Sequence, residues 1–238
     1  MKKKRLSFLA SIFPNRCAYC GARVPGDSLV CDDCSANLPR IEGPVCPKCG
    51  RGKKDCDCKG RENYYDGIAA PFYFEGAVRK GIHTFKFRNY TPGAREFARE
   101  IYKTVGKRFE GVVFDFITEV PVTEKSRRAR GFNQCRLIAE DLSEISGIPY
   151  EQGVLKKIYE TDAQHGLSAF LRRGNLAGVF DVTDPDKVKG KTVLLCDDIS
   201  TSGETLNECS KMLWLYGAKQ IYCVSVALTK AKKKPETR

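Results

Sequence analysis

Hydrophobic side chains recur at helical and strand-like spacings along the chain from about residue 66 onward. Apolar positions three and four residues apart predict helices over 91–107, 133–146 and 203–216. Runs rich in apolar, β-branched and aromatic residues predict strands over 66–74, 112–122, 193–196 and 220–228. Strands that alternate with helices in this way are typical of a mainly parallel, doubly wound sheet. We therefore expect an α/β fold for this part of the chain.

The segment before residue 60 has a different composition, dominated by cysteine. Eight of the 12 cysteines lie between Cys17 and Cys58, and the other four are spread through segments with core periodicity. Near residues 61–65, glycine and charge give way to an apolar and aromatic run. We place a boundary there and expect a small cysteine-rich domain over 1–63 and a larger α/β domain over 64–238.

The eight N-terminal cysteines form pairs with the spacing of metal ligands. Three pairs are Cys-x-x-Cys knuckles and the fourth is a tighter Cys-x-Cys. Such pairs predict two structural zinc sites with four thiolates each, and so no open position for a substrate. The predicted ligands are Cys17, Cys20, Cys31, Cys34, Cys46, Cys49, Cys56 and Cys58. Pairing in sequence order is the simplest arrangement, and interleaving of the first and third knuckles stays open.

A disulfide framework is the alternative for these cysteines. The further cysteines of the α/β domain and the absence of a clear secretory context favour zinc and a reducing compartment, so we expect a cytoplasmic protein. A basic start followed by a short apolar run, residues 1–13, has only a faint likeness to a signal peptide. No run approaches the roughly 20 apolar residues of a membrane span. The formal net charge of +12 indicates an anionic partner, either nucleic acid or a phosphorylated molecule.

Residues 191–205 combine an apolar strand, two acids, a hydroxyl-rich turn and a helix start. Paired carboxylates such as Asp197 and Asp198 at the end of a strand can bind ribose hydroxyls, and the N–H groups of the helix start form a cradle for phosphate. Gly203 allows the backbone to approach a ligand closely. An ordinary capped turn would explain one hydroxyl and one acid, but not the whole segment.

This segment resembles the 5-phosphoribosyl 1-diphosphate signature of type I phosphoribosyltransferases. The resemblance implies that fold, with Asp197 and Asp198 as catalytic residues that hold the ribose. It also implies a loop that binds the 5-phosphate, formed by Ile199, Ser200, Thr201, Ser202, Gly203 and Thr205. Ser202 stands where the signature usually has threonine. The acceptor would bind to a variable hood, expected over 64–88, whose aromatic residues either stack on a base or pack in the core.

Four further motifs, at residues 119–122, 127–134, 164–168 and 172–180, resemble those of the ComF competence proteins, the ComFC/GntX-like group. The resemblance implies a double zinc ribbon joined to a phosphoribosyltransferase domain and, in some bacteria, a role in DNA uptake during natural transformation. It implies 5-phosphoribosyl 1-diphosphate as ligand and Mg²⁺ as cofactor. Single-stranded DNA and DNA-uptake proteins such as a helicase are the implied partners.

The same resemblance assigns roles to residues outside the acidic segment. Val122 and Thr123 belong to the pyrophosphate turn, and the basic residues beyond it suit a leaving pyrophosphate bridged by Mg²⁺. These basic residues are Lys125, Arg127, Arg128 and Arg130. A plain exposed basic loop is the alternative. The Gly-rich stretch 164–175 would be a mobile flap, with ligand candidates Gln164, Arg172, Arg173 and Asn175.

Two functions compete at this point. A transferase would displace pyrophosphate from the ribose through positioning and electrostatics, without a protein nucleophile. A non-catalytic protein would handle single-stranded DNA or dock a protein through the zinc module and the basic surface, and would use the pocket for ligand sensing or not at all.

Overall fold

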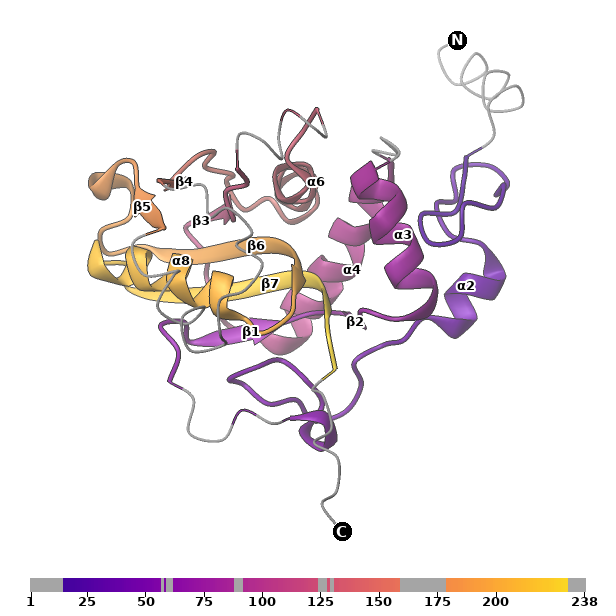
Figure 1. Cartoon of the computed structure of the whole chain (residues 1–238), viewed down its shortest axis with the longest axis horizontal. Coiled ribbons are helices and arrows are strands. Elements are labelled where there is room, and N and C mark those ends of the chain that lie inside the picture. Colours follow the sequence, from indigo (N-terminus) through magenta and orange to yellow (C-terminus); the bar gives the residue numbers. More distant parts are fainter. Residues whose placement is uncertain are drawn as a thin grey trace, which may run out of the picture.

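The computed structural model (Figure 1) describes residues 15–56, 58, 62–87, 92–123, 128, 131–158 and 179–230. A five-stranded sheet lies at its centre, and all the strand pairs in it are parallel. Its strands are β1 (Gly67–Ala69), β2 (Phe72–Tyr73), β3 (Phe116–Glu119), β6 (Thr192–Ser200) and β7 (Gln220–Leu228). β1 and β2 both pair with β7, which is followed by β6 and then β3. The predicted parallel α/β fold is confirmed.

Helices cover both faces of the sheet. α3 (Gly76–Phe87), α4 (Pro92–Arg108) and α6 (Gln134–Ser146) share one core with the sheet, and α8 (Glu204–Leu215) shares the other. The antiparallel pair β4 (Leu155–Lys157) and β5 (Phe180–Val182) lies on the α8 side. Short helices complete the described elements: α2 (Asp32–Asn37), η1 (Lys53–Asp55) and η2 (Pro185–Lys187).

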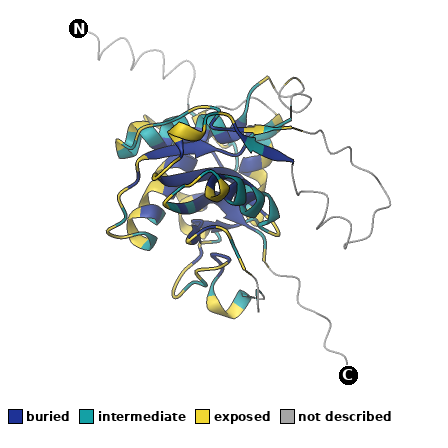
Figure 2. Cartoon of the chain, turned by 90° about the vertical axis from the view of Figure 1, so that its left-hand side faces the viewer, coloured by how far each residue is buried: buried dark blue, intermediate teal, exposed yellow. Residues whose placement is uncertain are grey.

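The residues of β6 alternate between the two cores, as the two-residue period of a strand requires. Leu194 and Cys196 contribute to the core under α4 and α6, whereas Val193 and Leu195 contribute to the core under α8. Figure 2 shows the resulting layers, with buried strands between helices whose outer faces are exposed. No helix in the described part of the chain has the length and apolarity that crossing a membrane requires.

Helix ends agree closely with the prediction because local signals fix them. The side chain of Asn133 accepts a hydrogen bond from the Cys135 N–H at the start of α6, and Gly147, at φ 75°, ends the helix. Strand limits agree less well. Only 116–119 of the predicted strand 112–122 is a strand, and the strand predicted over 193–196 continues to Ser200.

The segment predicted as a strand over 66–74 is broken into β1 and β2 at Pro71, which has no N–H to donate to the sheet. Both short strands lie at one edge of the sheet, beside β7. For the aromatic residues of the expected hood, 64–88, the sequence leaves two possibilities, and packing applies to Phe72, Tyr73 and Phe85, which are all buried.

The first ribbon, residues 15–38, packs on the α3 and α4 side of the sheet. The buried ring of Tyr19 lies with its centroid 5.8 Å from the centroids of both Phe72 and Phe97. Beyond this ribbon, the chain runs beside β2, where the Tyr73 N–H donates to the Pro39 carbonyl and the Ile41 N–H to the Pro71 carbonyl. The first ribbon therefore has no core separate from that of the sheet.

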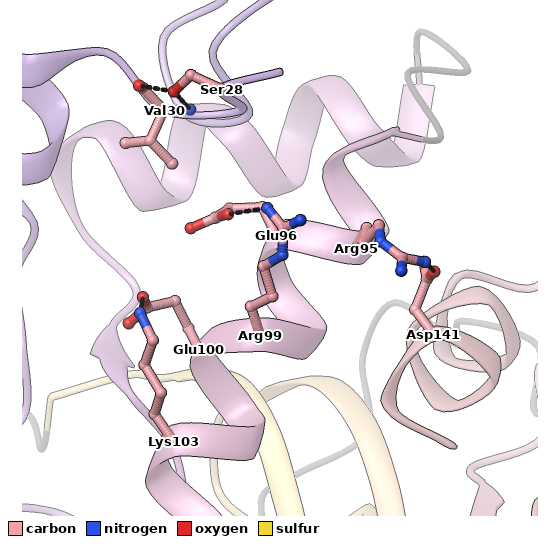
Figure 3. Close-up of polar contacts among 8 residues, drawn as sticks. All are labelled: Ser28, Val30, Arg95, Glu96, Arg99, Glu100, Lys103 and Asp141. Atoms are coloured by element: carbon pink, nitrogen blue, oxygen red, sulfur yellow. Dashed lines mark hydrogen bonds and ion pairs between the residues drawn. The ribbon is translucent and has the colours of Figure 1, made fainter. Parts of the chain in front are cut away.

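Ion pairs on α4 hold this connecting segment in place. Lys103 contacts the buried Glu100 carboxylate at 2.7 Å (Figure 3). Arg40 of the connecting segment contacts the same carboxylate at 2.6 Å. Burial alone would raise the pKa of Glu100, but the hydrogen bonds from Arg40 and Lys103 outweigh it and lower the pKa. Arg95 links α4 to Asp141 of α6 at 3.3 Å. α4 thus connects the ribbon segment to the α/β core.

The approach of α3 to the first ribbon leads to a stability prediction. A Cβ on Gly81 would lie 2.5 Å from the Ala18 carbonyl oxygen and 2.9 Å from the Tyr19 Cα, and both are backbone atoms. We expect Gly81→Ala to lower the free energy of unfolding by about 1–3 kcal/mol, as overpacking does. Urea unfolding of the zinc-loaded protein measures this change.

Gly106→Ala is the matched control, because this exposed glycine of α4 has open space at its Cβ. It should gain about 0.5–1 kcal/mol from helix propensity alone. Equal stabilities of the Gly81 and Gly106 variants would contradict the tight contact.

Candidate functional site

The candidate site lies where the parallel strands end. β6 carries Asp197 and Asp198 to this edge, and β3 lies beside it, with the Val120 N–H donating to the Cys196 carbonyl at 2.9 Å. Ligands of open α/β sheets bind at the carboxyl ends of the strands, where the helix starts also gather. Strand order therefore brings the acidic segment beside the turn that follows β3.

Both acids are almost inaccessible, at 8% exposed each. Asp197 Oδ1 accepts hydrogen bonds from the Asp198 N–H at 2.8 Å and from the Cys135 thiol at 3.4 Å. Asp198 Oδ2 lies 2.6 Å from Lys86 Nζ of α3. Burial, and then the charge of Asp198, raise the pKa of Asp197 well above its usual range. One of the two carboxyls thus holds a proton more tightly than a free aspartate does.

Sequence reasoning missed Lys86 and Cys135. Both residues sit on amphipathic helices whose spacing says only which face is buried, and no local motif marks either as a neighbour of the acids. Their proximity depends on α3 and α6 packing on the same face of the sheet.

The hydroxyl-rich segment forms the turn between β6 and α8. Ser200 is buried at the strand end, whereas Thr201 and Ser202 are exposed. Gly203 adopts φ 78° before the first residue of α8, and the Ser202 hydroxyl accepts from the Glu204 N–H at 3.4 Å. A left-handed residue at this point favours glycine, and the turn ends at the positive end of the helix dipole. The arrangement can bind an anion.

Other predicted ligands are described only in part. Val122 and Thr123 follow β3 and are half-buried, and Arg128 is exposed. The remaining predicted ligands lie outside the described residues: Lys125, Arg127, Arg130, Gln164, Arg172, Arg173 and Asn175. Ile199 and Thr205 flank the turn and are half-buried.

Glu119 adds a third buried acid at the same edge. It ends β3, and Tyr150 donates a hydrogen bond to its carboxylate at 2.9 Å. Burial raises its pKa, although this hydrogen bond acts in the opposite direction. Three buried carboxyl groups are therefore gathered at two neighbouring strand ends.

The N-terminal cysteines gather into two clusters in sequence order. Cys17, Cys20, Cys31 and Cys34 form the first, and Cys46, Cys49, Cys56 and Cys58 form the second, each with all sulfurs within 4.8 Å of one another. The Cys20 and Cys31 sulfurs are 3.6 Å apart and those of Cys46 and Cys58 are 3.3 Å apart. A tetrahedral zinc site with Zn–S bonds of about 2.3 Å would hold its sulfurs roughly 3.8 Å apart, so both clusters fit zinc. All 12 cysteines are free thiols, and the interleaved pairing is not found.

The raised pKa of Asp197 leads to a pH prediction. Because the folded protein binds this proton more tightly than the unfolded chain, its stability falls as the pH rises from the unfolded pKa through the raised one. Asp197→Asn removes this charge and keeps an oxygen acceptor for the Asp198 N–H. The variant should therefore gain stability over the wild type between about pH 6 and pH 8, by on the order of 1 kcal/mol.

Urea unfolding of both proteins at about pH 6 and pH 8 measures the difference in their free energies of unfolding. Titration of the thiols affects both proteins alike and cancels in this difference. The exposed Asp186→Asn serves as control and should show no such trend. A stability difference for Asp197→Asn that is constant with pH would contradict the assignment.

Comparisons with known proteins give matches for both the cysteine-rich segment and the α/β part of the chain. A family model described as the double zinc ribbon domain matches residues 8–64, and one described as the phosphoribosyl transferase domain matches residues 133–238. These matches contain the two cysteine clusters and the acidic segment of β6, respectively.

Relatives match both halves together. Competence protein F of Haemophilus influenzae is 29% identical over 90% of this chain and 96% of its own length. DNA utilization protein YhgH of Escherichia coli strain K12 is 28% identical over 89% of this chain and 96% of its own length. Competence protein ComFC of Bacillus subtilis is 25% identical over 79% of this chain and 78% of its own length. The chain thus combines a double zinc ribbon with a phosphoribosyl transferase domain, and it is similar along most of its length to these competence and DNA utilization proteins.

Proposed function

We propose that the chain binds 5-phosphoribosyl 1-diphosphate with Mg²⁺ at the carboxyl end of β6. The observation that carries the proposal is that two buried acids at the end of β6 are followed directly by a glycine-containing turn at the start of α8. Hydroxyl groups of a ribose would donate to the carboxylates of Asp197 and Asp198. The 5-phosphate would accept hydrogen bonds from the turn 199–205, at the positive end of the helix.

The pyrophosphate would lie on the turn after β3. Val122 and Thr123 would contact it there, and the basic residues Lys125, Arg127 and Arg130 would neutralise it. The stretch containing Gln164, Arg172, Arg173 and Asn175 would close over the ligand. Mg²⁺ would screen the charge between the pyrophosphate and the acidic strand ends. The reaction would form a bond from a nucleophile to the ribose C1 and break the bond from C1 to pyrophosphate, which leaves.

The two cysteine clusters would each bind one structural zinc ion, since four thiolates leave no position for a substrate. We further propose the division of the chain into a zinc-ribbon domain, 1–63, and a phosphoribosyltransferase domain, 64–238. A reducing compartment such as the cytoplasm suits eight thiolate ligands. Zinc would supply folding free energy to a segment that has little core of its own.

A role in DNA uptake is the second part of the proposal. Relatives named for competence and for DNA utilization support it, together with the net charge of +12. In a non-catalytic form of this function, the chain would bind single-stranded DNA or a protein of the uptake machinery such as a helicase. Its phosphoribosyl pocket would then sense a ligand or stay unused.

Calorimetric titration with 5-phosphoribosyl 1-diphosphate, with and without Mg²⁺, tests the pocket. The wild type should bind, and Asp197→Asn with Asp198→Asn should weaken binding at least about 100-fold, because two acceptors for the ribose lose their charge. Asp184→Asn with Asp186→Asn is the matched control at a distance from the edge and should bind like the wild type. Absence of wild-type binding would refute the proposed ligand.

Zinc content tests the two clusters. The purified chain should contain two zinc ions, measured by mass spectrometry of the metal. Cys17→Ser should reduce this to one, because a tetrahedral site with three thiolates binds more weakly. Cys209→Ala, a buried cysteine of α8, should keep both ions. Two ions retained by Cys17→Ser would contradict the first site.

Single-stranded DNA binding tests the alternative. If the basic surface binds DNA, the affinity should fall steeply with salt, because each neutralised phosphate releases counterions. The double variant Asp197→Asn, Asp198→Asn should then bind DNA as the wild type does, because the pocket takes no part. Equal loss of DNA binding and ligand binding in a folded double variant would argue for one shared site instead.

A further inference from the structure

Arg51 connects the second ribbon, which carries the cluster of Cys46, Cys49, Cys56 and Cys58, to the proposed phosphate turn, residues 199–205. It follows the knuckle Cys46–Cys49 by two residues, and only 7% of its surface is exposed. Its Nε donates to the Thr229 carbonyl at 2.6 Å, and its Nη2 donates to the Thr201 carbonyl at 2.6 Å. Thr201 belongs to the turn after β6, and Thr229 follows the end of β7. One buried guanidinium thus bridges two strand ends with charge-assisted hydrogen bonds, which are the strong kind.

The second ribbon is held against the sheet on the side that presents Arg51. Gly50 has φ 71°, and a Cβ there would lie 2.9 Å from the Ile68 carbonyl oxygen and 3.0 Å from Leu228 Cδ1. The Tyr73 hydroxyl of β2 accepts from the Gly52 N–H at 3.0 Å and donates to Asp55 at 2.6 Å. Contacts with β1, β2 and β7 therefore fix both neighbours of Arg51.

Cys49, a member of the second cysteine cluster, borders the same turn. Cys49 and Arg51 line one small hollow together with residues 200–203. The Thr201 carbonyl also accepts from the Thr229 hydroxyl at 3.2 Å, and the Thr229 N–H donates to the Ser200 carbonyl at 3.1 Å. The Thr201 carbonyl thus accepts hydrogen bonds both from the ribbon and from the residue that follows β7.

These hydrogen bonds orient the peptide group between Thr201 and Ser202. In a planar trans peptide, the C=O of Thr201 and the N–H of Ser202 point in opposite directions. With the carbonyl fixed toward Arg51, the Ser202 N–H is directed away from the ribbon. The turn then has one defined orientation before a ligand arrives, and such preorganisation reduces the ordering cost of binding.

We propose that the second zinc ribbon positions the phosphate turn through Arg51, so that the affinity of the phosphoribosyl site depends on this ribbon. The inference rests on the proposed ligand and deepens it. Arg51 is a positioning residue, since it acts on the turn through hydrogen bonds to the Thr201 and Thr229 carbonyls. The first ribbon has a different place, because Ala18 and Tyr19 pack against α3 instead.

Two measurements on Arg51→Met test the proposal. Hydrogen–deuterium exchange of peptides over 198–206 in the ligand-free protein should become faster, while exchange over 134–146 stays unchanged. The dissociation constant for 5-phosphoribosyl 1-diphosphate with Mg²⁺ should rise at least about tenfold, as expected for the loss of hydrogen bonds to a charged group. Zinc content, which should remain two ions per chain, reports whether the ribbon is still folded.

Arg23→Met is the matched control, because this exposed arginine follows a knuckle of the first ribbon by a similar interval. It should alter neither the exchange nor the affinity. Arg51→Lys keeps the charge but lacks the planar fork that reaches two carbonyls. We expect an intermediate affinity for it, and this variant decides the matter if Arg51→Met loses zinc.

The outcomes separate this inference from the proposed function. If the wild type does not bind 5-phosphoribosyl 1-diphosphate, the proposed ligand is wrong, and the exchange rates alone decide whether Arg51 orders the turn. If the wild type binds the ligand, and both Arg51 variants bind it with the affinity of the wild type and exchange over 198–206 at the wild-type rate, the positioning role is refuted.

Discussion

Placing Asp197 and Asp198 side by side in a buried strand costs free energy that the rest of the structure has to offset. The Lys86 ammonium neutralises one carboxylate at 2.6 Å, and the N–H of Asp198 with the Cys135 thiol supports the other. Lys86 reaches this position only because α3 lies on the α4 and α6 side of the sheet. α3 packs in the core on that side through Val78, Ile82 and Phe85, and it also lies close to the backbone of the first ribbon at Gly81. The helix that supplies Lys86 to the acid pair is therefore in contact with the cysteine-rich segment.

The two ribbons meet the α/β core at different places and reach the same edge. The first packs against α3, which carries Lys86, whereas the second contacts β1, β2 and β7 and reaches the turn through Arg51. The connecting segment runs along β2 between them, held by Arg40 on Glu100. The division at residue 63 is a boundary of composition. In the packing, Tyr19 belongs to the same core as Phe72 and Phe97.

Local signals in the sequence explain what could be predicted. Asn133 and Gly147 mark the ends of α6, the knuckle spacing gives both cysteine clusters, and the segment 197–205 contains its own strand, turn and helix start. Contacts between distant segments explain what could not. Arg51 reads as one more basic residue of a zinc ribbon, and its acceptor on the turn lies 150 residues away. Likewise, the continuation of β6 through the acids depends on pairing with β7, because aspartate is a poor strand former in isolation.

Zinc has a wider structural role in this arrangement than in an independent module. A zinc ribbon contributes folding free energy through its metal, because its own apolar surface is small. Here that surface is shared: Tyr19 fills a space between Phe72 and Phe97, and Gly50 lies against Ile68 and Leu228. Loss of either metal would therefore expose part of the sheet core as well as the ribbon. A disordered second ribbon would also release Thr201 from Arg51, so that metal content and the geometry of the anion-binding turn are linked through one side chain.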